Sequence, residues 1–158
     1  MLYVMKLKKI DKGELTKKFT EQANYYRLAA RLIDYGLVST WLANDDFGAD
    51  FIAIDHKNNL NIYAIQLKSR ITISLEYLEK NIYIAFPLKA SEPRKNWVIV
   101  PHDELEKIVF SKSDSKFNSI FEYAEGKSKS KTWHTANVTD KILNDVIELS
   151  ILDNPIDI

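Results

Sequence analysis

The sequence contains no cysteine, and this absence excludes disulfide bonds, thiolate metal sites and thiol nucleophiles together. Glycine and proline are also scarce, with four of each, and no segment rich in them divides the chain. No stretch approaches the roughly 18 consecutive apolar residues that a transmembrane helix needs. We therefore expect one soluble domain over residues 1–158, and the lack of cysteine favours a cytoplasmic protein.

A surplus of charge of one sign is absent as well, because 22 basic residues balance 22 acidic ones. A protein that holds nucleic acid through its overall field is normally basic. The charge is nevertheless uneven, since residues 1–40 carry eight Lys or Arg against four acids, whereas residues 132–158 carry one Lys against five acids. The first region predicts either a local basic surface near an N-terminal helix or a solvated helix face.

Hydrophobic periodicity predicts a helix followed by a series of strands. Apolar side chains recur at steps of three and four over residues 14–35, and Gly36 then provides a stop. Strands are expected at residues 37–42, 51–55, 61–69, 82–86 and 97–100. Residues 71–80 fit either a strand extension or a short helix. The order predicts an α/β domain with a central mixed sheet flanked by helices, and a core over about residues 13–110.

The C-terminal third is expected to add two helices around a polar segment. Asp103 and Glu106 form a capping-box pattern that opens a helix to about residue 110. Residues 111–131 are polar and rich in Ser and Lys, which predicts a loop that could hold a short helix over residues 117–124. Thr139 is expected to cap a final helix over about residues 139–152.

Two short motifs carry the chemistry. Gly48-Ala49-Asp50 opens one expected strand, and Gln66-Leu67-Lys68 lies in the next. Side chains alternate along a strand, so Gln66 and Lys68 project from the same face. Pairing of the two strands as a hairpin brings Asp50 to them. Lys68 follows the apolar residues of its strand, a setting that gives a lysine few structural reasons to exist.

Phosphodiester hydrolysis needs such a trio for separate tasks. A carboxylate such as Asp50 holds a divalent cation, which polarises the phosphate and lowers the pKa of a bound water. An amide oxygen such as that of Gln66 completes the oxygen coordination that Mg²⁺ prefers. An ammonium such as that of Lys68 orients the attacking water and offsets the charge on the phosphorane.

With the preceding helix that ends in Arg27–Gly36, these motifs resemble the PD-(D/E)XK nuclease superfamily, in the branch where Gln replaces the acid of the E-x-K element. The resemblance covers about residues 13–101. It implies a restriction endonuclease-like αβββαβ core, dependence on Mg²⁺ or Mn²⁺, and DNA or RNA as substrate, with DNA favoured. It also implies Asp50 and Gln66 as metal ligands and Lys68 as the catalytic lysine. The alternative is a noncatalytic nucleic-acid-binding or protein-interaction module on the same fold.

Two departures from the superfamily pattern concern the metal ligands. Members often supply a further Glu from the first helix, where this chain has Asn24, with Glu21 and Gln22 as alternatives nearby. The second departure is Gln66 itself, which is neutral and leaves Asp50 as the main anionic ligand. Asp45 and Asp46 lie close enough in sequence to contribute.

The hairpin register and the assembly can also be predicted. A three-residue loop at Lys57-Asn58-Asn59, with Asn58 or Asn59 at positive φ, would pair Ile54 with Ile62 and Ile52 with Ala64, and so set Asp50 opposite Gln66. Cutting both strands of a duplex needs two active sites, and a chain of this size supplies one. We therefore expect a C2 homodimer.

Overall fold

The computed structural model describes residues 9, 11–44, 48–57, 61–112, 116–126 and 132–158. Five strands form the main sheet in the order β1-β2-β3-β5-β6. Their bounds are β1 Leu37–Trp41, β2 Phe51–Asp55, β3 Ile62–Leu67, β5 Ile82–Pro87 and β6 Trp97–Pro101. Neighbouring strands are antiparallel except for the parallel pair β3 and β5. The expected α/β class and mixed sheet are confirmed.

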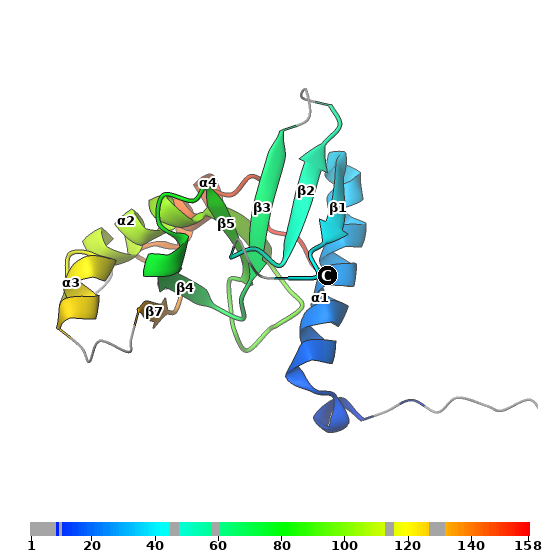
Figure 1. Ribbon diagram of the computed structural model, residues 1–158, viewed down its shortest axis with the longest axis horizontal. Helices are drawn as coiled ribbons and strands as arrows, with labels where there is room; N and C mark the ends of the chain where they lie inside the picture. Colours follow the sequence, from blue (N-terminus) through cyan, green and yellow to red (C-terminus); the bar gives the residue numbers. More distant parts are fainter. Residues whose placement is uncertain (1–8, 10, 45–47, 58–60, 113–115, 127–131) are drawn as a thin grey trace, which may run out of the picture.

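The remaining elements surround this sheet. A second sheet pairs β4 with β7. The α-helices are α1 Lys17–Leu32, α2 His102–Lys112, α3 Ile120–Glu125 and α4 Leu143–Glu148, the 3₁₀ helices are η1 Lys12–Glu14, η2 Ile33–Tyr35 and η3 Leu75–Tyr77, and the two extra strands are β4 Ile71–Ser74 and β7 Trp133–Ala136. In Figure 1, α1 lies beside β1–β3, and α2, α3, α4 and the small sheet gather at the other side. No helix among the described residues is long and apolar enough to cross a bilayer.

The ends of α1 follow from local sequence signals. The Thr16 side chain accepts a hydrogen bond from the Phe19 N–H and caps the first turn. The helix tightens into η2 and stops at Gly36, which adopts the left-handed conformation with φ 77°. The α-helix is therefore shorter at both ends than the expected span of residues 14–35.

The two faces of the main sheet bury different cores. Beneath α1, the buried residues include an aromatic group in which Tyr25 contacts both Trp41 and Phe51, with ring centroids 5.0 and 5.1 Å apart. The opposite face is mainly aliphatic and is closed by α2, α3 and α4, with Leu105 and Val146 fully buried. Successive residues of the central strands therefore contribute to the two cores in turn, and both faces of the sheet are covered.

The β2–β3 register matches the prediction. Ile54 pairs with Ile62 and Ile52 pairs with Ala64, as expected from the apolar match across the hairpin. Continuing this register by one residue sets Asp50 opposite Gln66. The turn residues Asn58 and Asn59, for which a positive φ is expected, lie outside the described residues.

The connection between the parallel strands β3 and β5 contains β4 and the three-residue η3. The short helix allowed within residues 71–80 is present as η3, whereas the preceding strand β4 belongs to the small sheet and does not extend β3. The αβββαβ pattern expects a helix in this crossover, and η3 is its only helical element.

Two capping predictions in the C-terminal third are wrong. Helix α2 begins at His102, so Asp103 lies inside it, and the Glu106 carboxylate accepts from the Ile120 N–H instead of closing a capping box. Helix α4 begins at Leu143, after a turn in which the Thr139 carbonyl accepts from Leu143. For Asp103 and Glu106, hydrogen bonds to Glu79 and Ile120 replace the capping bonds that the local pattern predicts. The predicted loop over residues 111–131 contains α3, in agreement with the short helix allowed there.

Candidate active site

Asp50 directly precedes β2 and is held against β3 by two hydrogen bonds, one from its backbone and one to its side chain. Its N–H donates to the Ile65 carbonyl at 2.9 Å, and its Oδ2 accepts from the Leu67 N–H at 2.6 Å. The carboxylate therefore meets β3 at the residue between Gln66 and Lys68. This contact also satisfies the Leu67 amide, which lies beyond the first residue pair of β2 and β3.

Gln66 is 3% exposed, and its Oε1 is buried without a hydrogen-bond partner. Its neighbours Ile65 and Leu67 belong to the core beneath α1, so alternation directs Gln66 toward the opposite, α2 face. A buried oxygen left without a donor costs about 1–3 kcal/mol. Such an oxygen needs a partner that the described residues do not supply, such as a cation or a water.

Lys68 follows β3 directly and is fixed by its N–H, which donates to the Ala85 carbonyl at 2.9 Å. Its Nζ lies 5.8 Å from the centroid of the Tyr77 ring, within range of a cation–π interaction. Tyr77 comes from η3 and is 7% exposed. The sequence offered no signal for Tyr77, because the contact joins the crossover to the strand that precedes it.

Tyr77 is itself fixed from two sides. Gly48 has φ +75°, and a Cβ there would lie 3.1 Å from the Tyr77 ring, so the glycine permits both the turn and the close approach. The His102 ring packs edge-on against Tyr77, with centroids 5.5 Å apart. The ring that contacts Lys68 therefore has little freedom to move.

His102 is 1% exposed and joins α2 to the crossover. Its Nε2 accepts from the Ser74 N–H at 3.1 Å, and its Nδ1 lies 3.0 Å from Asp103 Oδ1. An accepting Nε2 assigns the proton of the neutral ring to Nδ1. Burial lowers the pKa of His102, an effect that the neighbouring Asp103 carboxylate opposes.

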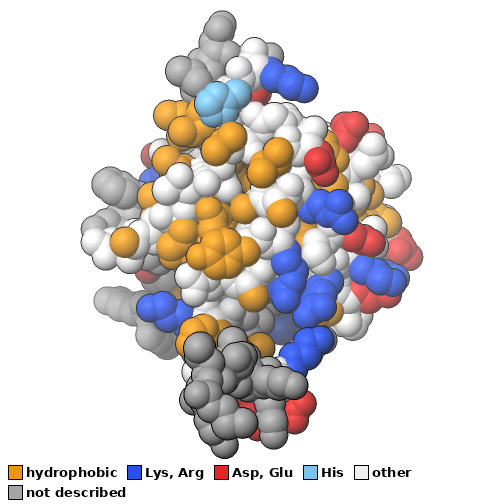
Figure 2. Space-filling model, turned by 90° about the vertical axis from the view of Figure 1, so that its right-hand side faces the viewer, with side chains coloured by type: hydrophobic (Ala, Val, Ile, Leu, Met, Phe, Trp, Pro, Cys, Tyr) orange, Lys and Arg blue, Asp and Glu red, His pale blue; other side chains and the backbone are white. Residues whose placement is uncertain are grey.

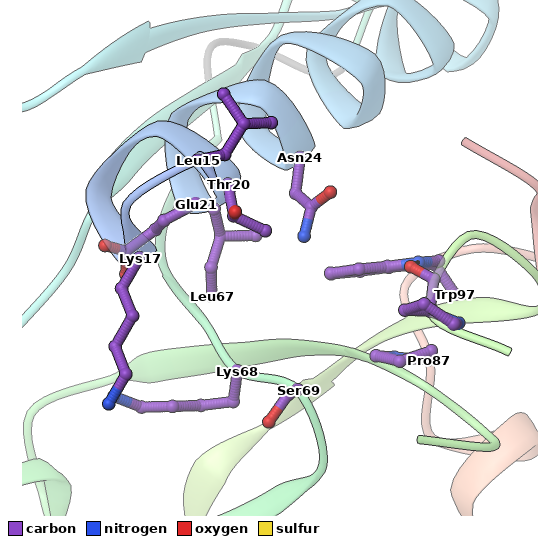
Figure 3. A pocket seen from close by; sticks show the side chains of 11 residues that line it. Leu15, Lys17, Thr20, Glu21, Asn24, Leu67, Lys68, Ser69, Pro87 and Trp97 are labelled. Atoms are coloured by element: carbon purple, nitrogen blue, oxygen red, sulfur yellow. Dashed lines mark hydrogen bonds between the residues drawn. The ribbon is translucent and has the colours of Figure 1, made fainter. Parts of the chain in front are cut away.

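Beside this group, a cleft of about 420 Å³ separates the start of α1 from the ends of β3, β5 and β6. Lys68 belongs to its lining, together with Glu21 and Asn24 from α1. Figure 3 shows these side chains around the cavity, with Trp97 and Pro87 on the far wall. Asp50 and Gln66 do not line the cleft. Of the Asp50, Gln66 and Lys68 trio, only Lys68 belongs to the cleft as well.

Only some of the supporting residues expected from the sequence lie at the cleft. Asn24 and Glu21 share the cleft with Lys68, whereas Gln22 does not line it. The Asn24 Oδ1 accepts from Arg27 Nη1 at 3.2 Å. Asp45 and Asp46 lie outside the described residues.

The oxygen atoms near Gln66 are of the type that a hard divalent cation prefers. They are the Asp50 carboxylate and the Gln66 amide oxygen, which accepts no hydrogen bond. The number of protein ligands is small. No group of three or more His, Asp or Glu side chains that could hold a metal occurs among the described residues. Asp50 and Gln66 would therefore leave most of the coordination sphere to water or substrate, and weak affinity follows.

Basic residues accompany α1 at the surface. Lys17, Lys18 and Arg31 are exposed on this helix. Figure 2, which views the molecule from the α1 side, shows Lys and Arg side chains gathered beside hydrophobic ones. Glu21 and Asp34 are exposed beside them, so these residues fit either expected alternative, a local basic surface or a solvated helix face.

Comparisons with protein-family models, curated proteins and solved structures found no match to this chain.

Proposed function

We propose that this protein is a metal-dependent nuclease that hydrolyses phosphodiester bonds in DNA and uses Mg²⁺ or Mn²⁺. The observation that carries the proposal is the buried Gln66 Oε1, which has no hydrogen-bond partner and lies one residue from the amide that binds the Asp50 carboxylate. A purely structural glutamine would be expected to satisfy that oxygen.

Each residue has a separate role in this proposal. Asp50 and Gln66 would hold the cation, which when bound supplies Lewis acidity and a water of lowered pKa. Lys68 places its ammonium beside the phosphate and offsets negative charge as the phosphorane forms. Tyr77 positions Lys68 through its ring face, and Gly48 and His102 hold Tyr77 in place.

Strand order also supports a restriction endonuclease-like core. The chain runs from α1 through the antiparallel strands β1, β2 and β3, and then crosses to β5 parallel to β3. Asp50 and the Gln-x-Lys element fall at the β2 and β3 positions that the superfamily resemblance assigns to them. The crossover departs from the pattern, since η3 replaces a full helix.

A noncatalytic module is the second candidate, and one observation favours it. The Asp50 carboxylate already caps the Leu67 N–H, which is a sufficient structural reason for an acid at this position. The two candidates differ in whether the Asp50 charge binds a cation.

The decisive experiment uses Asp50→Asn and titrates Mn²⁺ by calorimetry, alongside cleavage assays on plasmid, single-stranded and branched DNA. Asparagine keeps an oxygen that can accept from Leu67 but removes the charge. We expect Asp50→Asn to abolish the Mn²⁺ heat and to reduce cleavage at least about 10²-fold, because the anionic ligand is lost.

Asp55→Asn is the matched control. Asp55 ends the same strand, is 7% exposed, and its Oδ1 accepts from the Lys57 N–H at 2.8 Å. This variant should bind Mn²⁺ and cleave DNA like the wild type. Equal Mn²⁺ binding by wild type and Asp50→Asn, or no binding by either, would reject the nuclease and leave the noncatalytic module.

A further inference from the structure

We propose that the cleft beside α1 binds one unpaired nucleotide, with its phosphate at Lys17 and Lys68 and its base against Asn24 and the apolar wall. The inference rests on the proposed function for the phosphate beside Lys68, and it names the substrate class as single-stranded or locally unpaired DNA.

The charge at the rim of the cleft favours a phosphate. Neither Lys17 nor Lys68 has an ion-pair partner among the described residues, although both line the same cavity. The first turn of α1 contains no acid, so the positive end of the helix dipole adds to the two ammonium groups. In Figure 3, the side chains of Lys17 and Lys68 point to the same end of the cleft. Glu21 is the one carboxylate in the lining.

The interior of the cleft suits a base rather than a second phosphate. Leu67 and Trp97 are buried residues that form apolar wall, and the Trp97 Nε1 is already used by the Pro93 carbonyl at 3.1 Å. Asn24 supplies the polar contact. Because Arg27 donates to its Oδ1, the amide N–H₂ remains for a ligand, and Figure 3 shows this nitrogen directed into the cleft.

The size of the cleft limits the occupant. A volume of about 420 Å³ is at the lower end of small-molecule sites, which span about 300–1,000 Å³. In a duplex, bases are stacked and paired, so a base cannot enter such a cavity unless it leaves the helix. Apolar contact to a base combined with lysines along the backbone is the usual means of binding single strands.

The test measures binding of a fluorescein-labelled oligothymidylate by anisotropy without divalent metal, so that cleavage plays no part. Lys17→Ala should weaken binding and lower the slope of log affinity against log salt by about 1, because one phosphate contact is lost. Lys18→Ala is the matched control, since Lys18 is adjacent in the same turn and does not line the cleft. It should change affinity less than Lys17→Ala does.

Base contact is tested by combining Asn24→Ala with an abasic strand. The variant should lose about 2- to 10-fold in affinity for oligothymidylate, as for one hydrogen bond, and nothing for the abasic strand. Equal effects of Lys17→Ala and Lys18→Ala, equal effects of Asn24→Ala on both strands, or duplex binding as tight as single-strand binding would each overturn the inference. Metal-free binding that follows the expected pattern without any Mg²⁺-dependent cleavage would instead reject the nuclease and retain the cleft as a binding site.

Discussion

The two faces of the main sheet differ in how many polar side chains they bury. Three of the four buried polar or charged residues of the described chain, namely Gln66, Ser74 and His102, lie on or beside the α2 face. The fourth, Asp55, lies at the end of β2 on the α1 face, which is otherwise filled by aliphatic and aromatic side chains. Burying polar groups costs free energy unless each finds a partner. The comparison teaches that this cost is concentrated on the face where the proposed chemistry lies, whereas the α1 face consists mainly of packing residues and ends at the cleft that we propose as a binding site.

Lys68 is the residue at which the two faces meet, and its removal should give the largest effect. Lys68→Ala should slow cleavage about 10²- to 10³-fold on every DNA substrate, as expected when an oriented cation is lost at the phosphorane. Stability should fall by only about 0.5–1 kcal/mol, the size of the lost cation–π contact. Rates in Mg²⁺ and urea denaturation measure the two effects.

The control for Lys68→Ala is Lys107→Ala, which removes an exposed lysine paired with Glu104 on α2. Such surface pairs contribute little, and activity should not change. A Lys68→Ala variant that cleaves at the wild-type rate would remove Lys68 from the active site and with it the link between the two faces.

The unsatisfied oxygen on the α2 face gives a prediction of opposite sign. Gln66→Met should raise the free energy of unfolding in EDTA by about 1 kcal/mol, because a buried acceptor without a donor is replaced by an apolar side chain of similar length. The same variant should lose Mn²⁺ binding. Urea denaturation and calorimetry test the pair of outcomes.

Gln22→Met provides the corresponding change on the half-buried part of α1, and it should leave both quantities near the wild-type values. If Gln66→Met destabilises the fold, the glutamine belongs to a satisfied buried network, and the contrast between the two faces loses its main support.

A smaller effect concerns acid stability. Burial lowers the pKa of His102 in the folded state, so the unfolded chain takes up the proton first as the pH falls below about 6.5. Stability is therefore present above that pH and declines below it toward the folded-state pKa. His134 has a pKa lowered by burial as well and adds a loss of the same sign.

His102→Gln should flatten the stability profile between about pH 7.5 and pH 5.5, because Gln cannot take up a proton in this range. An amide oxygen can still accept from Ser74 N–H. His134→Gln isolates the second contribution. The urea denaturation midpoints at the two pH values test this prediction. If stability falls as much between them in His102→Gln as in the wild type, the α2 face does not carry the acid sensitivity.

The sequence predicts those parts of the molecule that depend on hydrophobic periodicity within one element or on the pairing of one hairpin. The match of Ile52 and Ile54 across the turn was enough to predict the β2–β3 register, because a shift by one residue would turn every side chain to the wrong face. The position of Asp50 beside the Gln-x-Lys element follows from the same register.

Contacts between segments distant in sequence were not predictable in this way. The pairing of β4 with β7 joins Ile71 to Ala136, and nothing in either segment alone indicates its partner. The contact of Tyr77 with Lys68 and the cleft between α1 and Trp97 also arise only when the crossover and helices are packed. Asp103 and Glu106 show the converse, since their local helix-capping pattern is overridden by contacts to Glu79 and Ile120.

Residues 156–158 tie the α1 face to segments that are distant in sequence. Ile156 exchanges two backbone hydrogen bonds with Trp97, and Arg31 donates to the Asp157 carbonyl across a separation of 126 residues. Closing so long a loop is entropically costly and slow. Until these contacts form, this side of Trp97 lacks its strand partner and the end of α1 lacks the hydrogen bond from Arg31. We therefore expect the wall of the cleft at Trp97 to form late in folding, because its contacts join segments far apart in sequence.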